Sequence, residues 1–129
     1  MTERSKLEIA DPVTWPFWEA ASRRVLLVQR CSACGSAQFY PRGFCLKCQS
    51  LDLGWIEASG KAVVHSVVTV RIPVTPELEP PYQVALVDLE EGVRLLTNIS
   101  GEDAAIGDSV VVDWRERAEA PPLPVFRRA

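Results

Sequence analysis

Two closely spaced cysteine pairs constrain the fold of this chain more than any other feature of its sequence. Cys31 and Cys34 form one C-x-x-C pair, Cys45 and Cys48 form a second, and the 129-residue chain contains no other cysteine. The ten residues between the pairs allow the second pair to fold back onto the first, so that four thiolates surround one metal ion. The pattern predicts a structural zinc site with these four ligands and one zinc ion per chain.

Other chemistries of four cysteines fit this sequence less well. Two disulfides need an oxidising compartment, whereas the first ten residues, MTERSKLEIA, contain no apolar stretch like that of a secretory signal. A thioredoxin-like redox site needs a single C-x-x-C where a strand meets a helix. Rubredoxin-type iron also takes four thiolates, and sequence does not exclude it. We prefer zinc because rubredoxins separate their two knuckles by a much longer segment.

The charges are divided unevenly along the chain. Residues 1–71 contain nine Lys and Arg against six Asp and Glu, whereas residues 72–129 contain five against eleven. A protein that binds nucleic acid usually shows a denser basic face than this. No apolar run approaches the ~20 residues of a membrane span, so we expect a cytoplasmic protein that does not enter a membrane.

Residues 1–24 are expected to form a polar tail and one short helix. Thr14 is a candidate N-cap for a helix that starts at Trp15. The rings of Trp15, Phe17 and Trp18 are hard to bury against a small zinc module alone. They either pack on the second module of the chain or dock into another protein, because aromatic residues are enriched in interface cores. Both interpretations stay open.

Residues 25–58 are predicted to form a zinc ribbon, and residues 59–129 a small β-barrel. The expected barrel elements, in chain order, are strands at 61–72, 82–89 and 93–99, a helical turn at 102–105, and strands at 109–114 and 123–126. This is the order of an OB-fold, a five-stranded barrel with its helix between strands three and four. The predicted fold class is therefore mainly β: a short N-terminal helix, a zinc ribbon and an OB-fold barrel.

The sequence contains no recognisable catalytic set. Its single histidine, His65, lies within a predicted strand, where it is more often a packing residue than a ligand. No nucleophile elbow, phosphate-binding loop or dinucleotide motif is present. A zinc ion held by four thiolates keeps no open coordination position for a substrate. We therefore expect a protein without independent catalysis.

Several segments, in this order and spacing, resemble the family of OB-fold, acyl-CoA-associated proteins with a rubredoxin-like zinc ribbon. The match covers about residues 14–128. Its motifs are FWEAA from Phe17, LVQRCSACG from Leu27, YPR from Tyr40 followed by CLKC, SGKAVVHS from Ser59, PPY from Pro80, VALV from Val84 and PVFR from Pro124. One departure is Gln49, which follows the second cysteine pair where a glycine is common.

The resemblance implies an accessory subunit of a thiolase-like enzyme, within a hetero-oligomer. The enzyme would carry out acyl transfer, Claisen condensation or retro-aldol cleavage of an acyl-CoA thioester in lipid or steroid metabolism. We expect Arg71 and the proline-rich loop after it to border the acyl-CoA entrance, because arginine suits the CoA phosphates. The expected contacts with the enzyme are Trp15, Phe17, Trp18 and Tyr40.

Two other functions remain as alternatives. The first is a single-stranded nucleic-acid-binding OB-fold, in which aromatic side chains stack on bases above a basic groove. The acidic C-terminal half of the chain, with Tyr82 and Trp114 as its only aromatics from 61 to 114, argues against it. The second is a stand-alone carrier of acyl-CoA, which would bind CoA esters without a partner.

Overall fold

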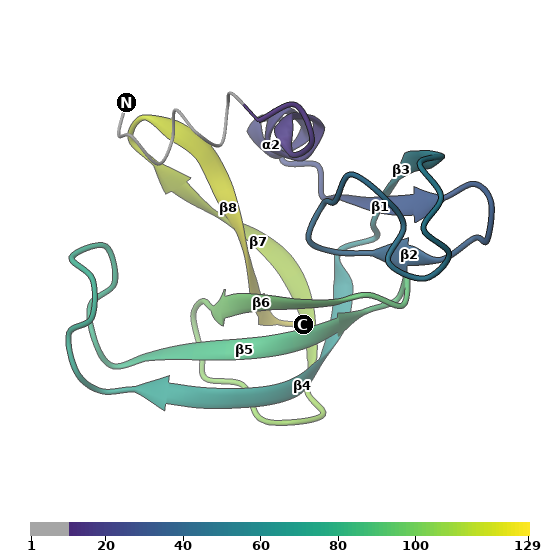
Figure 1. Cartoon of the computed structure of the whole chain (residues 1–129). Helices are drawn as coiled ribbons and strands as arrows, with labels where there is room; N and C mark the ends of the chain where they lie inside the picture. The colour runs from purple at the N-terminus through teal and green to yellow at the C-terminus, as the bar shows by residue number, and fades with distance from the viewer. Residues whose placement is uncertain (1–10) are drawn as a thin grey trace.

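The computed structural model describes residues 11–129, which fold into a small ribbon beside a barrel, with one helix above both (Figure 1). No helix in this part of the chain is long and apolar enough to cross a membrane. The elements are α2 (Trp15–Ser22), β1 (Leu27–Cys31), β2 (Ala37–Gln38), β3 (Leu53–Glu57), β4 (Lys61–Val70), β5 (Tyr82–Leu89), β6 (Arg94–Ile99), β7 (Ser109–Arg117) and β8 (Ala120–Arg128).

The ribbon is a three-stranded antiparallel sheet with β1 in its centre and the order β2-β1-β3. β1 pairs along its whole length with β3, from Leu27 opposite Glu57 to Cys31 opposite Leu53. β2 contributes two residues and places Gln38 opposite Gln29. The second cysteine pair lies in the loop between β2 and β3, so this sheet brings the loop back to the first pair.

The remaining strands close into a barrel in the order β4-β5-β6-β8-β7, with β4 pairing β7 to complete the circle. β6 and β8 are parallel, and all other neighbours are antiparallel. β4 serves both β5 and β7 because a bulge at His65, between Val64 and Ser66, bends it. This order confirms the predicted five-stranded OB-fold.

The helical turn predicted at residues 102–105 is wrong, because this segment is irregular in the structure. Ala104 lies buried there, and the side chain of Gln83 holds its backbone from inside the barrel. The Ala104 N–H donates to Gln83 Oε1 at 2.8 Å, and Gln83 Nε2 donates to the Ala104 carbonyl at 3.1 Å. This pair of bonds satisfies the backbone without a helix.

The helix, the ribbon and the barrel share one apolar core. Phe17 and Trp18 of α2 belong to the same buried cluster as Val28 of the ribbon and Phe126 of the barrel. Phe17 is 1% exposed and packs edge-on against Trp18 and Phe39, with ring centroids 4.8 and 5.4 Å away. α2 therefore fastens the ribbon to the barrel.

Replacement of Phe17 by alanine is expected to lower the free energy of unfolding by about 3–5 kcal/mol, because it empties the centre of this shared core. Replacement of the 40% exposed Trp15 on the same helix should cost less, about 1–2 kcal/mol, because its side chain is only partly buried. Urea titrations of both variants measure the difference. Equal losses in the two variants would contradict the shared core.

Candidate metal centre

The first metal-binding knuckle is a tight backbone turn at the end of β1. The Cys31 N–H donates to the Ser36 carbonyl at 2.9 Å, and the Gly35 N–H donates to the Cys31 carbonyl at 2.8 Å. Gly35 adopts a φ of 76°, which glycine tolerates without steric cost. The turn exposes Cys34 and buries Cys31.

The second knuckle repeats this geometry in the loop between β2 and β3. The Cys45 N–H donates to the Ser50 carbonyl at 2.8 Å, and the Gln49 N–H donates to the Cys45 carbonyl at 2.9 Å. Gln49 occupies the position of the glycine in the first knuckle and adopts a φ of 66°. The departure noted in the sequence therefore places a side chain in a conformation that L-residues disfavour by about 1–2 kcal/mol.

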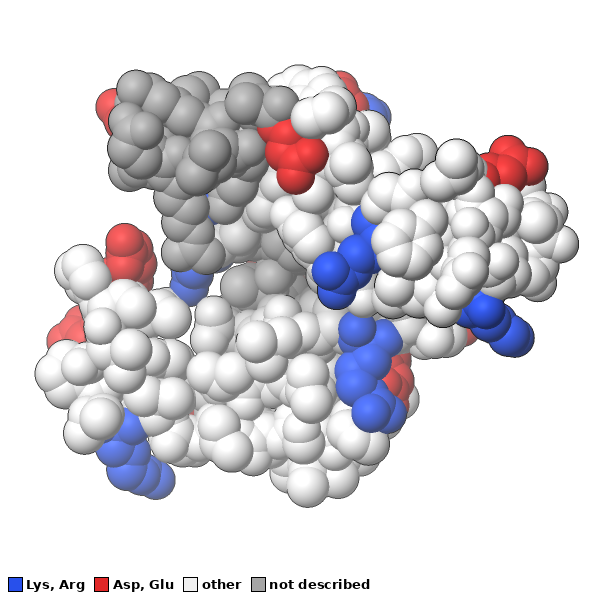
Figure 2. Space-filling view, in the orientation of Figure 1, with Lys and Arg blue, Asp and Glu red and all other residues white. Residues whose placement is uncertain are grey.

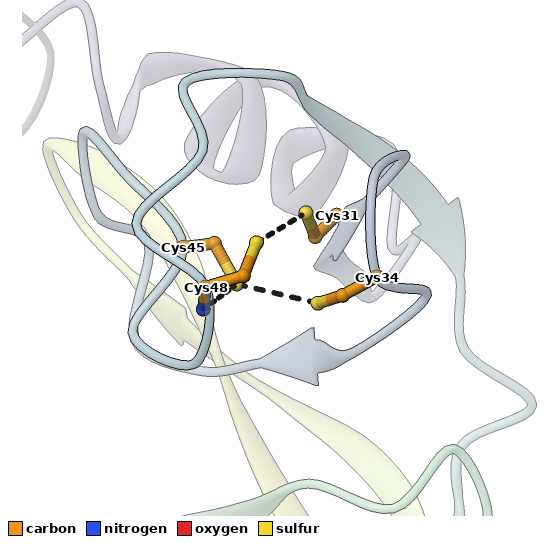
Figure 3. Close-up of side chains that lie close together, drawn as sticks. All are labelled: Cys31, Cys34, Cys45 and Cys48. Atoms are coloured by element: carbon orange, nitrogen blue, oxygen red, sulfur yellow. Dashed lines mark hydrogen bonds between the residues drawn. The ribbon is translucent and has the colours of Figure 1, made fainter.

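All four thiols converge between the two knuckles (Figure 3). Their Sγ atoms lie within 4.8 Å of one another, with Cys31 3.5 Å from Cys48 and Cys34 3.7 Å from Cys45. A zinc ion with Zn–S bonds of ~2.3 Å at the centre of a tetrahedron requires sulfur atoms about 3.8 Å apart. The donor set therefore fits a tetrathiolate zinc site, and no disulfide joins these cysteines.

The surroundings of the thiols favour a bound cation. Backbone hydrogen bonds, first from Cys48 and then from Lys47, lower the pKa of Cys45 to about 6 against the opposing effect of burial. A backbone bond from Ser50 lowers the pKa of Cys48, but the neighbouring sulfur of Cys31, burial and the other two sulfurs raise it to about 12. Four sulfurs this close cannot all carry negative charge unless a positive ion compensates it. A bound zinc ion would supply that charge and would hold the ribbon together.

Sequence reasoning missed two buried glutamines beside the metal centre. Gln29 is 4% exposed and Gln38 is 8% exposed, and they face each other across β1 and β2. The position of Gln29 could have predicted its burial, because it lies two residues before Cys31 and therefore on the same face of the strand. Gln38 Nε2 donates to Gln29 Oε1 at 2.9 Å.

The four aromatic residues predicted to contact a partner differ in exposure: two are buried and two lie on the surface. Phe17 and Trp18 are 1% and 5% exposed, so the prediction that they face a partner is corrected: they pack inside the chain's own core. The guanidinium carbon of Arg117 lies 5.1 Å from the Trp18 ring centroid. Trp15 and Tyr40 are 40% and 38% exposed and remain available on the surface.

The other two candidate positions lie on the barrel, apart from the cysteines. Arg71 is exposed and directly follows β4, where the proline-rich loop begins. His65 lies at the bulge of β4, with Nδ1 3.2 Å from Arg94 and 3.6 Å from Asp88. Hydrogen bonds from Arg94 lower the pKa of Asp88. The exposed side chains of His65, Asp88 and Arg94 therefore form an ion-pair cluster on the barrel, apart from the four cysteines in sequence.

Comparison with known proteins identifies both modules. Residues 18–54 match the family described as ChsH2, rubredoxin-like zinc ribbon domain, and residues 55–115 match ChsH2, C-terminal OB-fold domain. A DUF35 domain-containing scaffold protein of Methanocaldococcus jannaschii is 31% identical over 88% of this chain and 85% of its own length. The chain belongs to the ChsH2/DUF35 family. The family resemblance noted from the sequence motifs is thereby confirmed.

Two bacterial relatives in this family are longer proteins. The probable enoyl-CoA hydratase alpha subunit of Thermomonospora curvata is 44% identical over 88% of this chain. The 3-oxo-4,17-pregnadiene-20-carboxyl-CoA hydratase alpha subunit of Mycobacterium tuberculosis is 35% identical over 69% of it. This chain spans only 37% and 28% of their respective lengths.

A solved structure is also similar to this chain in three dimensions. The structure described as Ltp2-ChsH2(DUF35) aldolase has a chain that is 40% identical to this one, with a TM-score of 0.84. The superposition covers 92% of this chain and 95% of that chain. The ribbon, the helix and the barrel thus keep their arrangement in a ChsH2/DUF35 chain described together with Ltp2.

Replacement of Gln49 by glycine is expected to raise the free energy of unfolding by about 1 kcal/mol, because glycine adopts the positive φ of the second knuckle without a steric penalty. Replacement of Gly35 by alanine should lower it by a similar amount in the first knuckle. Denaturant titrations at buffered free zinc measure both. An unchanged free energy of unfolding in the Gln49→Gly variant would show that the positive φ of Gln49 does not destabilise the protein.

The purified protein is expected to contain one zinc ion per chain, and replacement of Cys45 by serine should abolish stoichiometric binding, because the buried Cys45 thiolate closes the tetrahedron. Elemental analysis by mass spectrometry measures the metal content. A red protein with one iron per chain, or a metal-free protein with two disulfides, would contradict the zinc assignment.

Proposed function

We propose that this chain is a non-catalytic accessory subunit of a thiolase-like enzyme that acts on acyl-CoA thioesters. The observation that carries the proposal is the 0.84 TM-score, at 40% identity, with the ChsH2(DUF35) chain of an Ltp2 aldolase. The name "scaffold protein" of the archaeal relative supports a role in assembly. The names of the longer bacterial relatives support a CoA-thioester substrate, and one of them names a steroid-derived thioester.

The metal centre supports a structural role. Four thiolates saturate a tetrahedral zinc ion, so the ion has no position left for a substrate or a reactive water. In residues 11–129, the only group of three or more close metal-binding side chains is this cysteine cluster. In the proposed complex the thiolase-like subunit performs the acyl transfer, Claisen condensation or retro-aldol cleavage. Four cysteines kept as thiolates also suit a reducing, cytoplasmic location.

The proposed docking surface lies on the helix and the ribbon. Trp15 and Tyr40 are its central contacts, because they keep about two fifths of their surface exposed at the edge of the shared core. The neighbouring ribbon loop adds further exposed apolar side chains, namely Phe44, Leu46 and Leu51. Apolar side chains that gather on one exposed surface indicate a contact surface, whereas single exposed apolar residues do not.

The barrel is proposed to border the acyl-CoA entrance of the enzyme. Arg71 is the only Lys or Arg between Lys61 and Arg94, and its exposed guanidinium suits a CoA phosphate. Ile72 and Val74 follow it, 68% and 65% exposed, and offer apolar surface to the pantetheine or acyl chain. Figure 2 shows a largely uncharged surface over β4 and β5, which fits a buried contact better than a polyanion groove.

Replacement of both Trp15 and Tyr40 by alanine is expected to weaken binding to the thiolase-like subunit at least tenfold, because exposed aromatic residues commonly dominate interface energies. Replacement of the 69% exposed Ile106 on the barrel should leave the affinity unchanged. Biolayer interferometry with the purified subunit measures both variants. Equal affinity of the double variant and the wild type would overturn this docking surface.

Replacement of Arg71 by alanine is expected to leave the complex intact and to raise the KM of the enzyme for its acyl-CoA substrate, because the CoA phosphates lose a cationic contact. Steady-state kinetics of the assembled complex measure this. An unchanged KM would remove Arg71 from the CoA site. Tight binding of CoA esters by the isolated chain, in calorimetry, would instead favour a stand-alone carrier.

A further inference from the structure

The two knuckles of the metal centre differ in one hydrogen bond. In the first knuckle, the N–H of Ser32, the residue after the first ligand, donates to the backbone carbonyl of Asp52 at 2.9 Å. In the second knuckle, the N–H of the corresponding residue, Leu46, donates to a side chain, Gln38 Oε1, at 3.0 Å. A glutamine amide thus replaces the backbone partner that the first knuckle finds in the loop before β3.

The same glutamine holds the chain on the other side of Cys45. Gln38 Nε2 donates to the carbonyl of Phe44 at 3.1 Å and to Gln29 Oε1 at 2.9 Å. Gln38 therefore contacts the residue before Cys45 and the residue after it. Its amide oxygen accepts one bond and its amide nitrogen donates two, so its hydrogen-bonding groups are in use while its side chain is buried.

Gln29 extends this bracing to the start of the loop. The Arg42 N–H donates to Gln29 Oε1 at 2.8 Å, and Gln29 Nε2 donates to the Arg42 carbonyl at 2.8 Å. The two side chains therefore hold the backbone at Arg42, Phe44 and Leu46. The ribbon has few buried apolar residues of its own, so these bonds supply much of the order of the loop.

We propose that Gln29 and Gln38 form a positioning pair for the metal centre, which fixes residues 42–46 so that Cys45 presents its thiolate before the ion binds. Neither glutamine is a ligand. Removal of the pair would leave the Leu46 N–H, the Phe44 carbonyl and both backbone groups of Arg42 without their partners. The ion would then have to order the second knuckle itself, and its affinity would fall. This inference is independent of the proposed partner enzyme.

The test measures the zinc dissociation constant of the full-length protein by competition with a chromophoric chelator. Replacement of Gln38 by leucine is expected to weaken zinc binding about 10- to 100-fold, the usual effect of losing groups that orient metal ligands. The Co²⁺-substituted variant should keep the absorption bands of a tetrathiolate site, because all four ligands remain. The Leu46 amide should lose protection from hydrogen exchange in the zinc-free variant.

Gln83 provides a matched control, because it is a 7% exposed glutamine that braces the Ala104 backbone with the same two bonds, far along the chain in the barrel. Replacement of Gln83 by leucine should destabilise the fold and leave the zinc dissociation constant within twofold of the wild type. Equal weakening of zinc binding by the two leucine variants would reduce the effect to general destabilisation and overturn the proposal.

The Gln38→Glu variant tests the proposal if the Gln38→Leu variant does not fold. Gln38→Glu keeps the acceptor for the Leu46 N–H and loses the donors to Phe44 and Gln29, so zinc binding should weaken at least threefold. Gln83→Glu is its control and should leave zinc affinity unchanged. Wild-type zinc affinity in the Gln38→Glu variant would overturn the proposal.

Discussion

Four cysteine thiolates that must share one cation are the constraint on which the rest of this structure depends. The ribbon has only short strands and few buried apolar residues, so it cannot hold its loops by apolar burial alone. Metal binding supplies that order. Once the ribbon is closed, β1 presents Val28 to the common core, and Phe17 of α2 fastens it to the barrel. The helix, the ribbon and the barrel then form one body with a defined outer surface.

Much of this architecture can be predicted from the sequence because local patterns and global structure agree. The two C-x-x-C pairs predicted the ligand set, and all four Sγ atoms converge as expected. The β-branched run from Lys61 predicted the long first strand of the barrel, and the turn at Gly92, with a φ of 86°, joins the next two strands. These signals are local: each depends on residues close together in the chain.

The features that sequence reasoning missed or left open depend on contacts between distant segments. The sequence left open whether Phe17 and Trp18 pack inside the chain or on a partner, and the position of α2 against β8 and β1 shows that the chain buries them itself. Ala104 has a helix-forming sequence around it, yet the amide of Gln83, 21 residues away, fixes it as an irregular segment. The Gln29–Gln38 pair is invisible until β1 and β2 are in register.

In the proposed complex, this chain contributes structure and no chemistry. The most direct test is steady-state turnover of an acyl-CoA substrate by a purified Ltp2-like subunit, by this zinc-loaded chain, and by the two together. We expect no turnover by the chain alone, and higher activity or a longer active lifetime of the subunit when the chain is present. Turnover by the chain alone, or a subunit indifferent to its presence, would contradict the accessory role.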